Sequence, residues 1–203
     1  MGYLIAILLA YLLGSSSMTW YLGKLQQIDP RTSGTGNLGA SNAAVLLGWG
    51  AGVLVGIHDV GKGFLSVVLV RWLFPDVAYV GELAGVACVL GHIFPFYLGF
   101  RGGKGLAAFM GVIWALNLGL AVVALVLLVL VTAVSDYIAL GTLTVAVAAP
   151  VGLWAMTGDA WASLVLCAGS AVIILKHMGN LRRIAAGKEI GLRSTIKGEH
   201  RVK

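Results

Sequence analysis

The chain has 203 residues, of which 59% are hydrophobic and 11% are charged, and its mean hydropathy is +0.95. A soluble domain of this size does not carry so much apolar surface, so lipid is the expected solvent for most of the chain. The formal net charge of +6 does not indicate nucleic-acid binding, because eight of the fourteen Lys and Arg residues fall in residues 176–203, where a membrane protein places its cytoplasmic tail.

The apolar runs predict an all-α, polytopic membrane protein that forms one domain over residues 1–203, with a basic tail at 176–203. The candidate spans are residues 2–22, 43–74, 77–98, 106–134, 137–156 and 160–175. Residues 106–134 are too long for one upright span, so this run is expected either to tilt or to break near residues 117–119. About seven transmembrane helices fit the run lengths best, and five is the alternative.

The distribution of cations predicts the orientation. Lys24, Arg31, Arg101 and Lys104 join the eight cations of residues 176–203, so twelve of fourteen lie on one predicted side. Lys and Arg collect in cytoplasmic loops of membrane proteins. The N-terminus is therefore expected outside and the C-terminus in the cytoplasm, which requires an odd number of spans.

Three polar clusters, residues 32–42, 99–105 and 176–189, are expected on this cytoplasmic side. They are rich in Gly, Asn, Thr and cations. Glycine lets backbone N–H groups approach a ligand, and Lys104 carries the charge that a phosphate needs. Irregular backbone at membrane depth is tolerated where it lines a polar cavity. Together the clusters predict a shared phosphate-binding pocket at the cytoplasmic surface.

Each cluster also has a purely structural interpretation. The first could be a flexible loop that ends in a helix N-cap at Ser41 or Asn42. In the second, Lys104 could be a positive-inside anchor, and His92 could cap or kink a helix. The basic residues of the third could bind lipid headgroups. The second cluster is not a nucleotide-binding P-loop, because GGKG lacks the GxxxxGK[ST] spacing.

His58, Asp59 and Lys62 are ionisable residues inside an apolar run. Ionisable groups at membrane depth are costly and by default indicate a functional site. Asp59 and Lys62 are three positions apart, so on a helix they could equally do no more than neutralise each other.

In order and spacing, four stretches resemble the motifs of the bacterial acyl-phosphate-dependent glycerol-3-phosphate acyltransferases, the PlsY family. They are GTGNLGASN at residues 34–42, DVGKG at 59–63, GHIFPFYLGFRGGKGLA at 91–107 and HMGNLRRIAAGKE at 177–189. Each motif alone is moderately specific, whereas the ordered set corresponds over nearly the whole chain.

The resemblance implies a seven-helix integral enzyme of the bacterial plasma membrane whose active site faces the cytoplasm. It would transfer a fatty acyl group from acyl phosphate to the 1-hydroxyl of glycerol 3-phosphate, giving lysophosphatidate and inorganic phosphate in phospholipid biosynthesis. No metal and no other cofactor is expected. The expected partners are the two substrates, membrane lipids and an acyl-phosphate-forming enzyme, without nucleic acid.

The resemblance also implies roles for individual residues. Lys104 would neutralise the phosphate of glycerol 3-phosphate or of the acyl donor, and Thr35 and His177 complete the expected catalytic set. Backbone N–H groups of residues 34–39 and 102–103 would bind phosphate oxygens. The departing phosphate or His177 would take the hydroxyl proton. The expected substrate-binding residues are Gly34, Gly36, Asn37, Asn42, His92, Gly102, Gly103, Asn180 and Arg182.

Two positions depart from the family pattern. The family usually has Ser where this chain has Thr35, and Arg where it has Val45. Loss of the guanidinium removes a bidentate phosphate contact, so another cation, from Lys62, Arg101 or Arg182, would have to replace it. Two rival interpretations are a membrane carrier or binding protein for a phosphorylated solute or lipid, and a structural helper of lipid synthesis.

Overall fold

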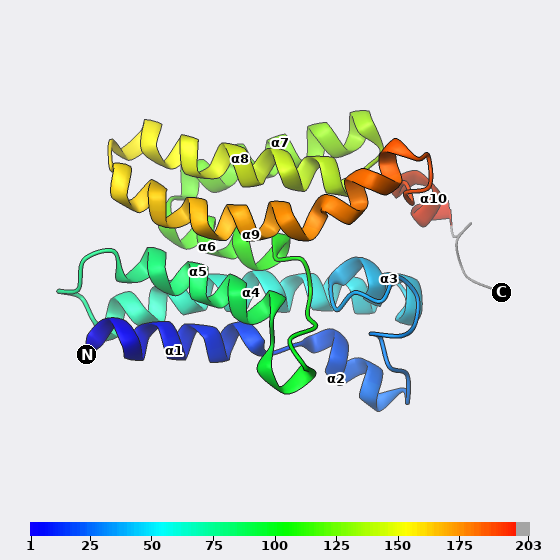
Figure 1. Cartoon of the computed structure of the whole chain (residues 1–203), viewed down its shortest axis with the longest axis horizontal. Coiled ribbons are helices and arrows are strands. Elements are labelled where there is room, and N and C mark those ends of the chain that lie inside the picture. The colour runs from blue at the N-terminus through cyan, green and yellow to red at the C-terminus, as the bar shows by residue number, and fades with distance from the viewer. Residues whose placement is uncertain (198–203) are drawn as a thin grey trace. The chain divides into compact units, whose positions relative to one another are not determined.

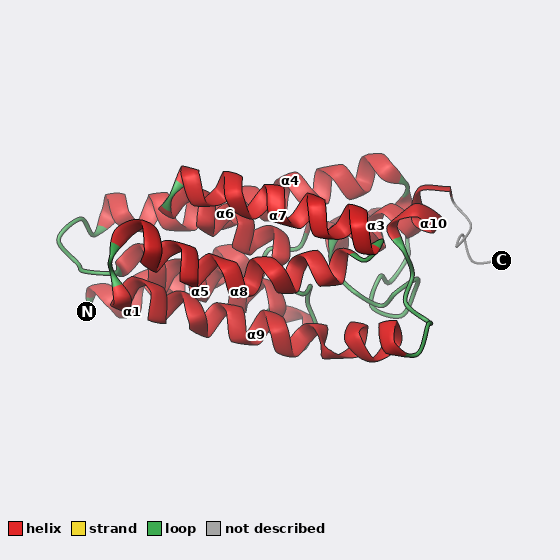
Figure 2. Ribbon diagram, turned by 90° about the horizontal axis from the view of Figure 1, so that it is seen from above, coloured by secondary structure: helices red, strands yellow, loops and turns green. Residues whose placement is uncertain are grey.

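The computed structural model describes residues 1–197, and within them the chain is helical, with no strand. Figure 1 traces the helices in chain order, and Figure 2 shows that loops connect them. The elements are α1 (Gly2–Ser15), α2 (Met18–Leu25), α3 (Ala40–Leu47), α4 (Trp49–Leu73), α5 (Val80–Ile93), the 3-10 helix η1 (Phe96–Leu98), α6 (Leu106–Leu116), α7 (Leu118–Ser135), α8 (Ile138–Thr157), α9 (Ala160–Ala185) and α10 (Leu192–Lys197). The all-α prediction is confirmed.

Six helical stretches of the described chain are long and apolar enough to cross a membrane. They are Gly2–Leu25, Trp49–Leu73, Val80–Leu98, Leu118–Ser135, Ile138–Thr157 and Ala160–Ala185. Helix α6 is also apolar, but its 11 residues extend only about 16 Å, against a hydrocarbon thickness of about 30 Å. The chain is therefore a multi-pass membrane protein with six candidate spans in residues 1–197 and one shorter apolar helix.

The long apolar run at residues 106–134 is divided at Asn117, between α6 and α7. Asn117 has an extended backbone, and its side-chain oxygen accepts the backbone N–H of Leu120 at 2.9 Å. Such an N-cap satisfies one of the N–H groups that a helix leaves unpaired at its start. The run therefore breaks, as one of the two alternatives predicted.

The described residues form two compact units, residues 1–116 and residues 117–197. The first unit holds α1 to α6, and the second holds α7 to α10. The single domain expected from the sequence stays a prediction.

In the first unit, α1 packs on α5, and α4 packs on α1, α5 and α6. Glycines permit the closest of these approaches. A Cβ on Gly14 of α1 would overlap the backbone carbonyl of Cys88 on α5, and a Cβ on Gly63 of α4 would overlap that of Ala108 on α6. Small residues let membrane helices gain packing energy where lipid offers no hydrophobic driving force.

The first span is interrupted between α1 and α2, at Ser16 and Ser17. A helix end leaves backbone carbonyls without intrahelical partners. Side chains from elsewhere in the first unit satisfy two of them: the hydroxyl of Tyr97 donates to the carbonyl of Ser15 at 3.0 Å, and Nζ of Lys62 donates to that of Ser16 at 2.7 Å. The break therefore creates a polar site inside an apolar unit.

In the second unit, α8 packs on both α7 and α9. The segment after α9 returns to the end of α7. The backbone N–H of Leu192 donates to the carbonyl of Asp136 at 2.7 Å, and that of Arg193 donates to its carboxylate at 2.9 Å. These bonds anchor the connection that carries Glu189 between α9 and α10.

Candidate active site

The first glycine loop, residues 26–39, joins α2 to α3 and is organised by Asn42 of α3, whose side chain is fully buried. Its Oδ1 accepts the backbone N–H of Thr35 at 2.7 Å, and its Nδ2 donates to the carbonyls of Pro30, at 2.9 Å, and Ser33, at 3.3 Å. Both the donor and the acceptor ends of the amide are thus engaged inside the loop. The amide therefore holds the loop, and the prediction that Asn42 also binds substrate stays a prediction.

Thr35 lies exposed on a turn between Gly34 and Gly36. Both glycines have a left-handed backbone, with φ of +61° and +70°, and a Cβ on Gly34 would overlap Oδ1 of Asn42. The N–H of Gly36 donates to the carbonyl of Ser33 at 3.1 Å and so stabilises the turn, while its predicted phosphate contact stays a prediction. The loop therefore presents the side chain of Thr35, and Asn37 lies half-buried beside it in sequence.

Arg31 and Asp29 form an ion pair at the start of the first glycine loop. The guanidinium donates to the carboxylate at 2.8 Å from Nη2 and at 3.0 Å from Nε. These hydrogen bonds hold the pKa of Asp29 at about 2, below its usual value. The same guanidinium lies over the Trp20 ring, 4.6 Å from its centroid, and the ammonium of Lys24 lies over that ring at 4.9 Å. Two cations therefore flank this loop.

The second glycine loop, residues 99–105, folds back on the end of α5. The N–H of Gly102 donates to the carbonyl of Ile93 and that of Gly103 to the carbonyl of His92, both at 3.1 Å. A Cβ on Gly102 would overlap the His92 carbonyl, and a Cβ on Gly103 would overlap the His92 imidazole. Backbone carbonyls thus accept both N–H groups in this structure, and the prediction that these N–H groups bind phosphate stays a prediction.

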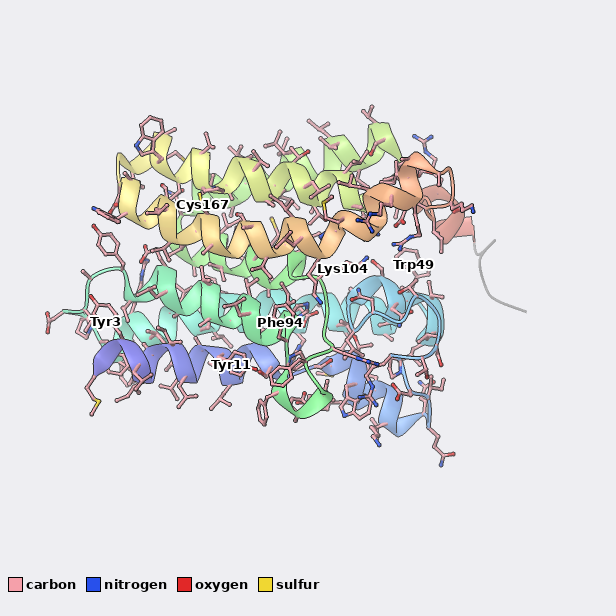
Figure 3. The ribbon with its side chains drawn as sticks, viewed as in Figure 1. Tyr3, Tyr11, Trp49, Phe94, Lys104 and Cys167 are labelled. Atoms are coloured by element: carbon pink, nitrogen blue, oxygen red, sulfur yellow. The ribbon has the colours of Figure 1, made fainter. Side chains whose placement is uncertain are left out.

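Lys104 follows directly, half-buried, in the segment between η1 and α6 (Figure 3). The bonds of Gly102 and Gly103 fix the backbone that leads into it. The structure places His92, predicted to bind substrate, in a buried position against Gly103, with 6% of its surface exposed. Arg101, by contrast, is exposed.

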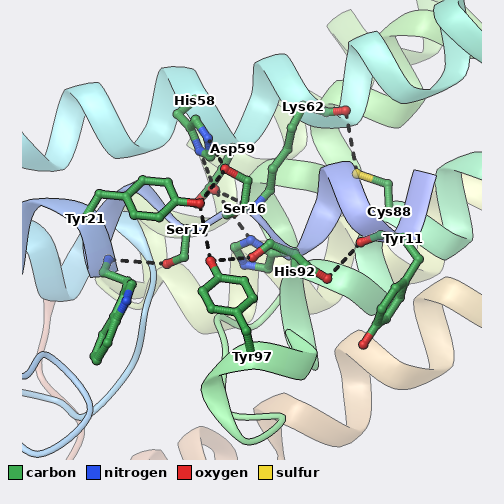
Figure 4. A network of polar contacts seen from close by, with 12 residues as sticks. Tyr11, Ser16, Ser17, Tyr21, His58, Asp59, Lys62, Cys88, His92 and Tyr97 are labelled. Atoms are coloured by element: carbon green, nitrogen blue, oxygen red, sulfur yellow. Dashed lines mark hydrogen bonds and ion pairs between the residues drawn. The ribbon is translucent and has the colours of Figure 1, made fainter. Parts of the chain in front are cut away.

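The intramembrane ionisable residues form a buried cluster in the first unit (Figure 4). Oδ1 of Asp59 lies 2.9 Å from Nζ of Lys62, 3.3 Å from Nδ1 of His58 and 3.5 Å from Nδ1 of His92. Asp59 and Lys62 therefore pair, as one alternative predicted, but within a larger cluster. Lys62 is buried and bound to Asp59 and to the Ser16 carbonyl, so it is less available for a phosphate than the exposed Arg101 and Arg182.

In the second unit, α9 places His177 and Asn180 one turn apart, and both are buried. The prediction that they share one helix face is confirmed. Nδ1 of His177 lies 2.8 Å from the backbone carbonyl of Ile173. A carbonyl can only accept, so Nδ1 carries the hydrogen and Nε2 is the basic nitrogen of the neutral ring.

Glu189 is a residue that the site prediction missed. Nδ2 of Asn180 donates to its Oε1, and Nε of Arg183 donates to its Oε2, both at 2.6 Å. Gly187, with φ of +65°, turns the chain back so that Glu189 reaches α9. Its position at the end of the third motif was the sequence feature that could have indicated a role in the site. Arg182, predicted to bind substrate, is exposed on α9.

The predicted site residues are thus divided between the two units. Thr35 and Lys104 belong to the first, and His177 and Asn180 belong to the second. The shared phosphate pocket stays a prediction.

A family described as Glycerol-3-phosphate acyltransferase matches residues 4–187. Proteins named glycerol-3-phosphate acyltransferase are similar over nearly their whole length. That of Coxiella burnetii (strain CbuG_Q212) is 38% identical over 195 residues, which are 93% of this chain and 97% of the relative. That of Thioalkalivibrio sulfidiphilus is 37% identical over 198 residues, 95% of this chain and 96% of the relative.

Two crystal structures of PlsY (YgiH), an integral membrane glycerol 3-phosphate acyltransferase, are similar at 30% sequence identity. The glycerol 3-phosphate form has a TM-score of 0.90 and covers 97% of this chain and 98% of its own. The lysophosphatidic acid form has a TM-score of 0.87 and covers 97% of this chain and 100% of its own. Motifs, fold and sequence identity thus agree over the same length, and the chain belongs to the glycerol-3-phosphate acyltransferase family, that of PlsY.

Proposed function

We propose that this protein transfers a fatty acyl group from acyl phosphate to the 1-hydroxyl of sn-glycerol 3-phosphate, forming lysophosphatidate for phospholipid biosynthesis. The observation that carries the proposal is family membership over nearly the whole chain. The similar PlsY structures comprise one form with glycerol 3-phosphate and one with lysophosphatidic acid. Because these are a substrate and a product of one acyl transfer, they favour bond formation over the carrier interpretation.

The reaction needs little covalent help from the protein. The 1-hydroxyl oxygen attacks the acyl carbonyl carbon, a new C–O bond forms, and the bond from that carbon to the phosphate oxygen breaks. The hydroxyl proton passes to the departing phosphate or to Nε2 of His177. Acyl phosphate is a mixed anhydride with a good leaving group, so positioning and charge neutralisation suffice without an acyl-enzyme.

The site residues divide this work. Lys104 neutralises a substrate phosphate. The exposed turn of the first glycine loop presents the hydroxyl of Thr35 to that phosphate. His177 and Asn180 orient the glycerol phosphate or its attacking hydroxyl. Glu189 supports this role, because its hydrogen bond fixes the orientation of the Asn180 amide.

We assign to Arg101 the phosphate contact that an arginine at position 45 would make, since this chain has Val45 there. Arg101 lies in the same glycine loop as Lys104 and is exposed, whereas Lys62 is buried in its own cluster. Arg101→Gln should raise the KM for one phosphorylated substrate by about tenfold, the effect of losing one charge-assisted hydrogen bond. Arg182→Gln is the matched control, and a larger effect there would transfer the role to Arg182.

The proposed site faces the cytoplasm of the bacterial plasma membrane, with the N-terminus outside. The twelve cations on one predicted side support this orientation, and α6 would be a short seventh helix. A phosphatase fused to the C-terminus tests it, because this reporter should stay inactive in the cytoplasm. An active fusion protein would contradict the proposed orientation.

We also propose a functional partnership with an enzyme that forms acyl phosphate.

The test of the activity is product formation by purified protein in detergent. Acyl phosphate and glycerol 3-phosphate together should release phosphate and yield lysophosphatidate, and neither should do so alone. Lys104→Ala should abolish the product while the protein remains folded. Folded wild-type protein that exchanges glycerol 3-phosphate across liposomes without forming product would establish the carrier interpretation instead.

A further inference from the structure

We propose that Asp59, Lys62 and His92 are positioning residues that hold the second glycine loop, and with it Lys104, in the geometry the reaction needs. The catalytic consequence rests on the proposed function. The mechanical part rests on contacts within the first unit alone.

His92 touches the loop twice, immediately before Lys104. Its backbone carbonyl accepts the N–H of Gly103 at 3.1 Å, and its imidazole fills the space that a Cβ on Gly103 would need. The ring is almost fully buried. Rotation or displacement of this ring would therefore press on the backbone of Gly103 or leave it unsupported.

Asp59 faces the other side of the His92 ring. Its Oδ1 lies 3.5 Å from Nδ1 of His92, a contact between a carboxylate and a ring nitrogen that is longer than a strong hydrogen bond. The same oxygen also contacts Nζ of Lys62 at 2.9 Å, which fixes the carboxylate in place, and a fixed carboxylate in a buried site favours a ring orientation that keeps Nδ1 of His92 toward it. Asp59 on α4 thereby orients a ring on α5 that supports the loop.

The cluster contains more polar groups than are needed to neutralise the Asp59 carboxylate. A single ammonium, that of Lys62 at 2.9 Å, would neutralise the Asp59 carboxylate. Lys62 also donates to the carbonyl of Ser16 at the break between α1 and α2. His58 bridges the same two places, with Nδ1 at 3.3 Å from Asp59 and Nε2 at 3.1 Å from Oγ of Ser16. The cluster thus ties together the break between α1 and α2, helix α4 and helix α5 (Figure 4).

The chain that enters the loop is also tied to α1. The hydroxyl of Tyr11 donates to the carbonyl of Phe94 at 2.7 Å, and that of Tyr97 donates to the carbonyl of Ser15 at 3.0 Å. The residues on either side of Pro95 are therefore held in place. The Asp59 cluster completes this support at the point where the loop returns to α5, directly before Lys104.

A second ion pair on the same helices provides a matched control. Nη2 of Arg71 lies 2.8 Å from Oε1 of Glu82, so this pair also links α4 to α5. It joins the last turn of α4 to the first turn of α5, whereas the second glycine loop meets the last turn of α5. Removal of either pair takes one positive and one negative charge from the first unit, although Asp59 and Lys62 both lie on α4 whereas Arg71 and Glu82 lie on different helices.

The first test is hydrogen–deuterium exchange of the purified full-length protein, which does not depend on activity. In Asp59→Asn/Lys62→Met, the amides of residues 101–105 should exchange about tenfold faster, because their support is lost. In Arg71→Met/Glu82→Gln they should exchange as in the wild type. Unchanged exchange of residues 101–105 in the first variant, with the protein folded, would overturn the proposal.

The second test is a comparison of KM and kcat. Lys104→Arg should raise the KM for one of the two substrates, acyl phosphate or glycerol 3-phosphate. Asp59→Asn/Lys62→Met should raise the KM for that same substrate. A purely structural role would lower the amount of active enzyme and leave both KM values unchanged, and that result would also overturn the proposal. If the double variant does not fold, His92→Asn decides by the same readouts, since it keeps an amide near Asp59 but removes the ring from Gly103.

The two proposals can fail separately. If the wild type forms no lysophosphatidate, the proposed function fails, while the exchange of residues 101–105 still decides whether the cluster supports the loop.

Discussion

The two glycine loops look alike in sequence but are held by different means. The first is organised by a side chain, the amide of Asn42, which reaches in from the helix that follows. The second is organised by the backbone and ring of the helix that precedes it, through Ile93 and His92. In the first loop Gly34 and Gly36 both have a left-handed backbone, and Gly34 also leaves space for Oδ1 of Asn42. In the second loop Gly102 and Gly103 serve close packing against the end of α5. Glycine-rich motifs of one composition therefore meet two different physical requirements.

The largest expected effect tests the packing requirement of the second loop. A Cβ on Gly102 would overlap the carbonyl of His92 and lie 2.6 Å from Cδ of Pro95, so Gly102→Ala must shift the loop. A misplacement near 1 Å at a reacting group costs about 100-fold, and we expect at least that loss in kcat/KM for lysophosphatidate formation.

Gly99→Ala is the matched control in the same loop. Gly99 has φ of +65° but nothing within 4 Å of an added Cβ, so only backbone strain of about 1–2 kcal/mol is expected. A larger loss of activity in Gly99→Ala than in Gly102→Ala would contradict the packing explanation.

The next effect tests the first loop. Asn42→Ala leaves the N–H of Thr35 and the carbonyls of Pro30 and Ser33 without their partner, which costs about 1–3 kcal/mol for each buried group left unsatisfied. The melting temperature in detergent should therefore fall. Asn37→Ala, in the same loop, should raise the KM for a phosphorylated substrate without lowering the melting temperature. Equal melting temperatures for the two variants would show that Asn42 does not hold the loop.

A smaller effect concerns the cations beside each loop. The second loop carries Arg101 and Lys104, whereas α3, after the first loop, carries half-buried Val45 where the family has arginine. Val45→Arg adds a bidentate donor and should lower the KM for a phosphorylated substrate by up to about tenfold. Val45→Leu should leave it unchanged. If the KM does not fall, Arg101 of the second loop already supplies the phosphate contact that an arginine at position 45 would make.

The smallest expected effect is pH-dependent. The pKa of Asp29 is about 2 in the folded protein, below an ordinary value of about 4, because Arg31 hydrogen-bonds to the charged form. The stabilisation is therefore present above pH 4 and is lost as the pH falls toward 2. Asp29→Asn should lack this pH dependence, which thermal melts between these pH values measure. The difference should be small, because the pair is exposed.

The sequence by itself determined the features that depend on local composition and periodicity. Hydropathy predicted a multi-pass helical membrane protein and left a tilt or a break near residues 117–119 as alternatives, and helical spacing placed His177 and Asn180 on one face. The ordered motifs were sufficient for the family. Such features need only neighbours within a few residues, because hydropathy and helix geometry act over that range.

Only the tertiary structure decided what the polar residues of the motifs do. Asn42 holds a loop, the N–H groups of Gly102 and Gly103 bind backbone carbonyls, and Asp59 lies against His92 on another helix. Glu189 reaches Asn180 through a turn whose geometry the motif does not state. A polar side chain can satisfy a ligand or a buried backbone group equally well, so its role depends on which partners packing brings within hydrogen-bond distance.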